Sequence, residues 1–180
     1  MYTEYRPATM NTEKLKNLIL FFVTKISSEN LGKTKLFKLI FFADYEANNR
    51  IGYTISGDTY LKFPRGPVPK SASMVIKDME EKKELIVNEE LRNGYFLTTY
   101  KALINPEMGI FSGEERDILG SVLGDFGNKS RGKLVELSHQ MESWLKVGMY
   151  EEMTFDNTNG PSPEVFLNEY KRDMNALSSE

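Results

Sequence analysis

Apolar side chains recur at helical spacing along most of this chain, in stretches that begin next to residues able to cap a helix. Asn11 and Thr12 precede the first stretch, and a break at residues 27–32 separates it from the second. Such spacing puts one side of each stretch in a protein core, so it predicts two amphipathic helices. Their apolar stripes are Leu15, Leu18, Ile19, Phe22, Val23 and Ile26, and then Leu36, Leu39, Ile40 and Ala43.

The apolar period shortens to two residues at two places, which indicates β-strands. Residues 53–55 and 59–63 flank Ser56-Gly57-Asp58, and this arrangement predicts a tight hairpin over 53–63. Residues 86–87 and 95–100 flank Asn93-Gly94, a dipeptide typical of two-residue hairpin turns. The sequence therefore predicts two hairpins inserted among helices.

Four further helices are predicted from the polar residues at their first positions. The clearest begins with a capping box, in which Ser112 is followed three residues later by Glu115, and it ends at Gly127. The other three begin at Ser71, Ser130 and Ser162-Pro163. The last of them, over 163–177, carries Phe166, Tyr170, Met174 and Leu177 along one side.

Together these elements predict an α+β fold, a mostly helical single domain with a small antiparallel sheet of two hairpins inserted between helices. A length of 180 residues fits one domain. We expect residues 1–150 to form this domain. Residues 151–180 then make a linker and a C-terminal amphipathic helix packed on the same domain.

The composition limits the kinds of site and segment that this chain can form. Cysteine is absent, which excludes disulfides, thiolate metal sites and a thiol nucleophile. The N-terminus lacks the apolar region of a signal peptide, and the longest apolar run, residues 39–43, is far shorter than the ~20 residues that span a bilayer. We therefore expect no membrane association, no cofactor and a cytoplasmic location, in a bacterial or phage setting.

Charge is unevenly distributed along the chain. The net charge is −3, yet residues 1–40 hold seven basic residues and only three acidic ones. The negative total argues against non-specific nucleic-acid binding, while the basic start leaves open a weak contact with phosphates through Lys33, Lys35 and Lys38. The same lysines are equally typical of the solvated sides of amphipathic helices.

Catalytic motifs are incomplete. Gly32-Lys33-Thr34 resembles the end of a phosphate-binding loop, but that loop requires a glycine where Ser27 stands, so a helix start is the better interpretation. No Gly-x-Ser-x-Gly turn presents a serine nucleophile. We therefore expect no enzymatic activity.

One metal-binding arrangement stays open as an alternative. Glu136, His139 and Glu142 are spaced so that a helix brings both carboxylates near the only imidazole of the chain. With Asp44 they could serve a metal-dependent hydrolase or nuclease. His139 is otherwise a structural residue, with one ring nitrogen bonded to backbone and its ring against Trp144.

Two features indicate structure or recognition instead of catalysis. Asp44 lies beside an apolar stripe, where an ionised carboxylate must be paired or hydrogen-bonded, so it is expected to pin its helix to the following hairpin through Arg65, Lys62 or backbone N–H groups. The segment Gly66-Pro67-Val68-Pro69 is a stiff extended elbow, because each proline fixes φ and restricts the residue before it. Such an elbow either displays side chains to a partner or redirects the chain.

The ordered set of these pieces resembles the Panacea domain, the family that includes the SocA-like antitoxins. The pieces are Leu36 through Phe41-Phe42-Ala43-Asp44, Gly57-Asp58-Thr59-Tyr60, Gly66-Pro67-Val68, the helix begun by Ser112 and Glu115, and Leu137-Ser138-His139 with Trp144. They cover roughly residues 31–145.

The resemblance implies a phage-associated, non-enzymatic antitoxin that binds and neutralises a cognate protein toxin, and that could also present the toxin to a ClpXP-type protease. A nucleic-acid-binding regulator of mobile-element genes is a further alternative. We expect the toxin to be contacted by Tyr60, Phe63, Arg65, Pro67, Val68 and Trp144, while Asp44, Gly66 and His139 hold the site in shape. The helix end at Asp44, the hairpin over 53–63, the Gly66–Pro69 elbow and the turn from His139 to Trp144 should converge in space.

Overall fold

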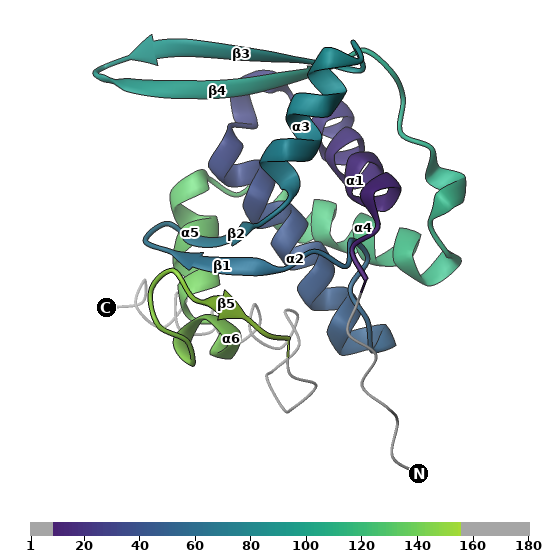
Figure 1. Cartoon of the computed structure of the whole chain (residues 1–180), viewed down its shortest axis with the longest axis vertical. Helices are drawn as coiled ribbons and strands as arrows, with labels where there is room; N and C mark the ends of the chain where they lie inside the picture. Colours follow the sequence, from purple (N-terminus) through teal and green to yellow (C-terminus); the bar gives the residue numbers. More distant parts are fainter. Residues whose placement is uncertain (1–8, 156–180) are drawn as a thin grey trace, which may run out of the picture.

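The structure, a computed structural model, describes residues 9–155 of the chain. Within that range the chain forms six α-helices and two small antiparallel sheets, and the sheets lie at the outside of the helical body (Figure 1). The helices are α1 (Thr12–Lys25), α2 (Lys33–Ile51), α3 (Ala72–Glu81), α4 (Gly113–Phe126), α5 (Arg131–His139) and α6 (Glu142–Leu145). The strands are β1 (Tyr60–Phe63), β2 (Gly66–Pro69), β3 (Leu85–Arg92), β4 (Tyr95–Ala102) and β5 (Glu152–Met153).

Helix α2 is the centre of the core. It contacts α1, α4, α5 and β2, and fourteen of its nineteen residues are buried. Phe42 stacks face to face on Phe126 of α4, with ring centroids 4.3 Å apart, and Phe41 meets Tyr60 of β1 edge to face. Phe41 and Phe42 therefore pack on different sides of α2, as expected for a helix at the centre of a core.

The two sheets lie apart on the molecule. Strands β3 and β4 form a long two-stranded hairpin at one end, and strands β2, β1 and β5, in that order, form a three-stranded sheet nearer the other end (Figure 1). All pairs are antiparallel. The prediction of a mostly helical α+β fold is confirmed.

Local signals located several elements correctly. Asn93 and Gly94 both have positive φ, 50° and 81°, as the turn of a two-residue hairpin demands, and they join β3 to β4. Both halves of the capping box of α4 are formed by Ser112 and Glu115. Asn11 and Ser130 cap α1 and α5 through their side chains.

The prediction of a hairpin over residues 53–63 is wrong. Residues 52–59 form a loop, and the hairpin is instead β1 paired with β2, so that Tyr60 faces Pro69 and Phe63 faces Gly66. The prolines of β2 are tolerated because β2 is an edge strand. The amide of Lys70 donates to the Thr59 carbonyl of the neighbouring chain segment. Because successive backbone nitrogens of a strand point to opposite sides, those of Pro67 and Pro69 point away from β1, where no N–H donor is needed.

The last described residues belong to the body of the domain. Strand β5 pairs with β1, Met153 is buried, and the ring of Phe155 stacks on Phe41. The C-terminal helix predicted over 163–177 lies outside the described residues. No helix within residues 9–155 is both long and apolar enough to cross a lipid bilayer.

Candidate functional site

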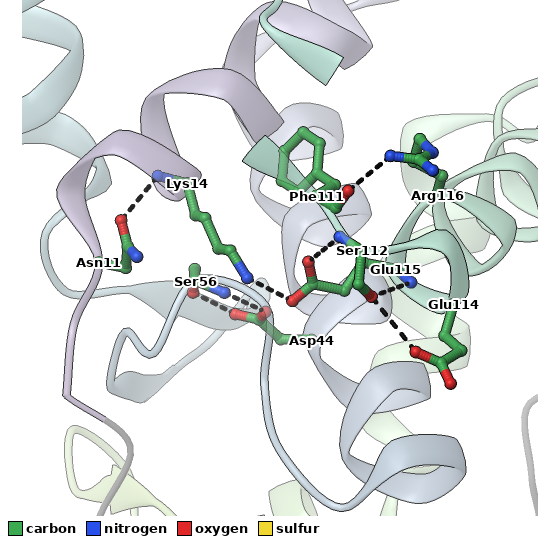
Figure 2. A network of polar contacts seen from close by, with 9 residues as sticks. All are labelled: Asn11, Lys14, Asp44, Ser56, Phe111, Ser112, Glu114, Glu115 and Arg116. Atoms are coloured by element: carbon green, nitrogen blue, oxygen red, sulfur yellow. Dashed lines mark hydrogen bonds and ion pairs between the residues drawn. The ribbon is translucent and has the colours of Figure 1, made fainter. Parts of the chain in front are cut away.

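Asp44 joins α2 to the loop that precedes β1. Its side chain is fully buried, and it accepts hydrogen bonds from the Ser56 amide at 2.8 Å, from the Ser56 hydroxyl, and from the Tyr60 hydroxyl at 2.7 Å. Figure 2 shows the contacts with Ser56. Burial raises the pKa of Asp44 to about 6, although the hydrogen bonds act in the opposite direction. The bonding partners are thus Ser56 of the loop and the Tyr60 hydroxyl of β1, and not Arg65 or Lys62 as the sequence also allowed.

A second acid, Asp58, fixes the other end of the same loop. Its carboxylate accepts from the Ser71 amide at 2.9 Å and from the Ser71 hydroxyl at 2.8 Å, which ties the loop to the start of α3. Asp58 also accepts from the Thr59 amide at 2.9 Å. Sequence reasoning placed Asp58 in a hairpin turn and missed this role; the available signal was an aspartate next to a glycine, a combination that also suits side-chain-bonded loops.

A third buried carboxylate connects α1 to α4. Glu115 is inaccessible to solvent, accepts from the Ser112 amide at 2.8 Å, and forms an ion pair with Lys14 at 2.6 Å (Figure 2). The capping-box glutamate therefore stabilises both the start of its own helix and the packing of the neighbouring helix. The buried acids Asp44, Asp58 and Glu115 each connect elements that are far apart in the sequence.

The β1–β2 hairpin approaches α2 and α5 closely at Gly66. A Cβ atom at this position would lie 2.3 Å from Ser138 Oγ and 2.7 Å from Lys38 Cε, and φ is +91°. Only glycine fits both the space and the backbone. Lys38 Nζ donates to the carbonyl of the next residue, Pro67. Burial of the Lys38 ammonium lowers its pKa to about 7.

His139 and Trp144 form a stack beside the tip of this hairpin. Their ring centroids are 4.1 Å apart and the planes are inclined by only 18°. The imidazole of His139 donates a hydrogen bond to the Pro64 carbonyl. Lys62 Nζ lies 3.9 Å from the centre of the Trp144 ring, which is a cation–π contact. Burial and the nearby Lys38 charge lower the pKa of His139. His139 and Trp144 therefore lie beside the β1–β2 hairpin, whereas the helix begun by Ser112 and Glu115 packs on α2 and α1.

The residues expected to contact a partner divide into buried and accessible groups. Tyr60 is inaccessible and Pro67 is buried, which corrects the expectation that they contact a partner at the surface. Phe63, Arg65 and Val68 share the wall of one cavity of about 390 Å³, which also includes the first turns of α2. Trp144 does not line this cavity. Besides stacking on His139, its ring contacts Lys62. Because side chains alternate along a strand, Lys62 lies on the opposite face of β1 from Phe63.

The basic face proposed for nucleic acid is not presented to solvent. Lys35 is buried and its ammonium donates to the Gly127 carbonyl at 2.7 Å, while Lys38 is 1% exposed and bonded to Pro67. Only Lys33 of the three is exposed, and it lies over the Phe37 ring. Two of the three ammonium groups are therefore withdrawn from any phosphate backbone.

The residues of the alternative metal site are dispersed. Glu136 forms an ion pair with Lys133 and Glu142 one with Lys146, while Asp44 points into the core from α2. Among the residues that the structure describes, no group of three or more His, Asp or Glu side chains could hold a metal ion.

Comparison with known families adds the remaining observation. The model of the family described as antitoxin SocA-like, Panacea domain, matches residues 36–145, which is more than half of the chain. The chain belongs to the SocA-like antitoxin family. No curated protein and no solved structure matches it. In this SocA-like chain the matched region contains Asp44, the β1–β2 hairpin and most of the lining of the 390 Å³ cavity, whereas Lys33 and Thr34 of that lining, α1 and β5 lie outside it.

Proposed function

We propose that this SocA-like chain is a non-enzymatic antitoxin that acts in the cytoplasm by binding a cognate protein toxin and holding it inactive. Family membership supplies the general role. The cavity at the β1–β2 hairpin carries the proposal further. It combines partly exposed apolar walls with cationic side chains, and one of its sides is a hydrogen-bonded strand pair. Rigid surfaces of this composition lose little entropy on binding.

The proposal assigns the toxin contact to Phe63, Arg65 and Val68. Trp144 is not part of this contact, because it packs against His139 and Lys62 on the opposite face of β1 from Phe63. The residues Asp44, Gly66 and His139 act by positioning, because each fixes the hairpin or its preceding loop against a helix. A rim of charged and apolar residues around a fixed backbone is typical of a recognition surface.

The experiment is co-expression with the product of the neighbouring open reading frame, where an antitoxin's partner is expected. Growth should be restored only when this chain is present in at least a one-to-one ratio, and a stable complex should survive gel filtration. Rescue at a small fraction of the toxin concentration would indicate catalytic protection and would contradict the proposal.

The binding surface is tested with Arg65→Ala and Val68→Asp. Both should leave the fold intact, yet weaken toxin binding by ~2 kcal/mol or more, as losses at an interface centre do. Lys77→Ala, an exposed change on α3, serves as the matched control. Unchanged binding in both variants would place the toxin elsewhere on the molecule.

Protease presentation is the finer part of the proposal. A ClpXP-type protease should shorten the half-life of the toxin when this chain is bound to it, and the toxin alone should persist. An equal half-life with and without the chain would leave neutralisation by binding as the whole activity.

A further inference from the structure

The cavity at the β1–β2 hairpin has apolar walls and a defined size. Phe37, Phe63 and Val68 supply the walls, and α2 and the hairpin form its two sides. Its volume of about 390 Å³ lies within the range of sites that bind small ligands or single side chains. An apolar side chain of a partner would fit the cavity without displacing the backbone.

The charged groups of this cavity all have the same sign. Lys33, Lys38 and Arg65 line it, and the lining contains no acidic residue. This concentration of positive charge occurs in a chain whose net charge is −3. A cavity with one sign of charge and apolar walls attracts the opposite charge more strongly than an open surface does.

Lys38 is the least expected of the three cations. It is 1% exposed, and within residues 9–155 its one hydrogen-bond acceptor is the Pro67 carbonyl. The other charged or titratable groups near it in the part of the chain that the structure describes are His139 of α5, with Lys33 and Arg65 at the cavity, and none of these supplies a negative charge. A buried ammonium without a counter-ion is costly, and a carboxylate entering the cavity would remove that cost.

We propose that this cavity binds an apolar segment of the partner protein through a carboxylate, with Lys38 as its buried counter-ion and Lys33 and Arg65 at the mouth. The inference rests on the proposed function, since the segment would belong to the toxin. Strand addition to β2 does not compete, because Pro67 and Pro69 lack the N–H donors that an added strand requires and the Pro67 carbonyl is already bonded to Lys38.

A matched pair of small molecules tests the carboxylate directly. The probes are 3-phenylpropionate and 3-phenylpropanamide, which share an apolar ring and differ in charge. In amide chemical-shift titrations we expect the acid to bind with a Kd of about 1 mM, roughly tenfold tighter than the amide, consistent with a ligand of this size. The perturbed amides should be those of Lys33, Phe37, Phe63 and Val68.

Two buried lysines of α2 provide the variant and its control. Lys38→Met should reduce the preference for the acid to near unity. Lys35→Met should keep it, because Lys35 is also buried and bonded to a carbonyl but lines a different cavity, of about 920 Å³. Equal binding of acid and amide to the parent protein, or shifts confined to Lys25, Lys129 and Arg131 of that larger cavity, would overturn the proposal.

The pH dependence of binding gives an independent measurement. Because the pKa of Lys38 is about 7, only its protonated fraction can pair with the probe. The affinity of the parent protein for the acid should fall about fivefold from pH 7 to pH 8, and further at pH 9. An affinity independent of pH in this range would contradict the role of Lys38.

The carboxylate contact and the antitoxin role can be refuted independently of each other. A toxin that binds Lys38→Met as tightly as the parent chain would refute the carboxylate contact, while neutralisation itself would stand. Conversely, acid-selective binding in this cavity together with a chain that restores no growth would refute the antitoxin role alone.

Discussion

Replacing Lys38 by methionine should change how the stability of this protein depends on pH. The side chain is 1% exposed, and burial lowers its pKa from 10.5 to about 7. Between these two values the unfolded chain binds more protons than the folded one. The free energy of unfolding of the parent protein therefore rises with pH across this window, and Lys38→Met removes that contribution.

The magnitude follows from the two pKa values. At pH 7 the ammonium reduces stability by about 4 kcal/mol relative to a solution above pH 10.5, and at pH 9 the reduction is about 2 kcal/mol. The parent protein should thus gain about 2 kcal/mol more than the variant between pH 7 and pH 9. For a chain of this size that corresponds to a differential shift of roughly 4–8 °C in Tm.

The assay is urea unfolding of both proteins at half-unit pH steps from 6 to 9.5, followed by the tryptophan fluorescence of Trp144. Only the difference between the two curves matters, because Lys35 and the buried tyrosines contribute equally to both. Lys77→Met, an exposed change on α3, should give a curve parallel to that of the parent.

Parallel curves for the parent and Lys38→Met would refute the reasoning, since they would mean that the ammonium is as well solvated in the folded protein as in the unfolded one. A variant that is less stable at every pH, by an amount that still widens as the pH rises, would indicate that the lost bond to the Pro67 carbonyl outweighs the removed charge.

Four other outcomes are expected. Asp44→Asn should flatten the pH dependence below neutrality. The pKa of Asp44 is raised from 3.8 to about 6, so the folded state holds the proton more tightly than the unfolded state, and the parent should lose about 2 kcal/mol relative to the variant as the pH rises from 4 to 6, measured by urea unfolding. Gly66→Ala should destabilise by about 2–4 kcal/mol because its Cβ meets Ser138 Oγ, whereas Gly120→Ala, with open space inside α4, should be neutral or stabilising in the same assay. Glu115→Gln should lower Tm by several degrees through the lost ion pair with Lys14, and a melt identical to the parent's would contradict its role. Deleting residues 160–180 should lower Tm measurably if the predicted helix over 163–177 packs on the domain; an unchanged melt with lost toxin binding would assign that helix to the partner instead.

Elements whose signals are local were predictable from the sequence. The capping box at Ser112, the Asn93-Gly94 turn and the periodic stripes of α1 and α2 each depend on a few neighbouring residues, and they form as expected. The first hairpin was misplaced because Ser56-Gly57-Asp58 also resembles a turn. In the structure these residues are held by Asp44 and Ser71, and neither contact has a local signature.

The candidate site depends still more on long-range packing. The spacing of Lys35 and Lys38 on a helix is compatible with an exposed basic side, and only the positions of Gly127 and Pro67 show that both side chains point into the protein. The burial of Tyr60 likewise follows from a strand that crosses α2. The accessible part of the site, Phe63, Arg65 and Val68, lies at the tip and edge of one hairpin, where sequence neighbours remain spatial neighbours.

The pairing of β5 with β1 has a consequence for synthesis on the ribosome. Strand β1 emerges about ninety residues before β5, so its second edge has no partner until Met153 has left the exit tunnel. Phe155, which completes the aromatic cluster of Phe41, Tyr45 and Tyr60, arrives later still. During that interval the nascent chain exposes an open strand edge and an apolar cluster, and both are prone to aggregation or incorrect pairing. A fragment that stops at residue 145, where the family match ends, would expose this edge and this cluster permanently.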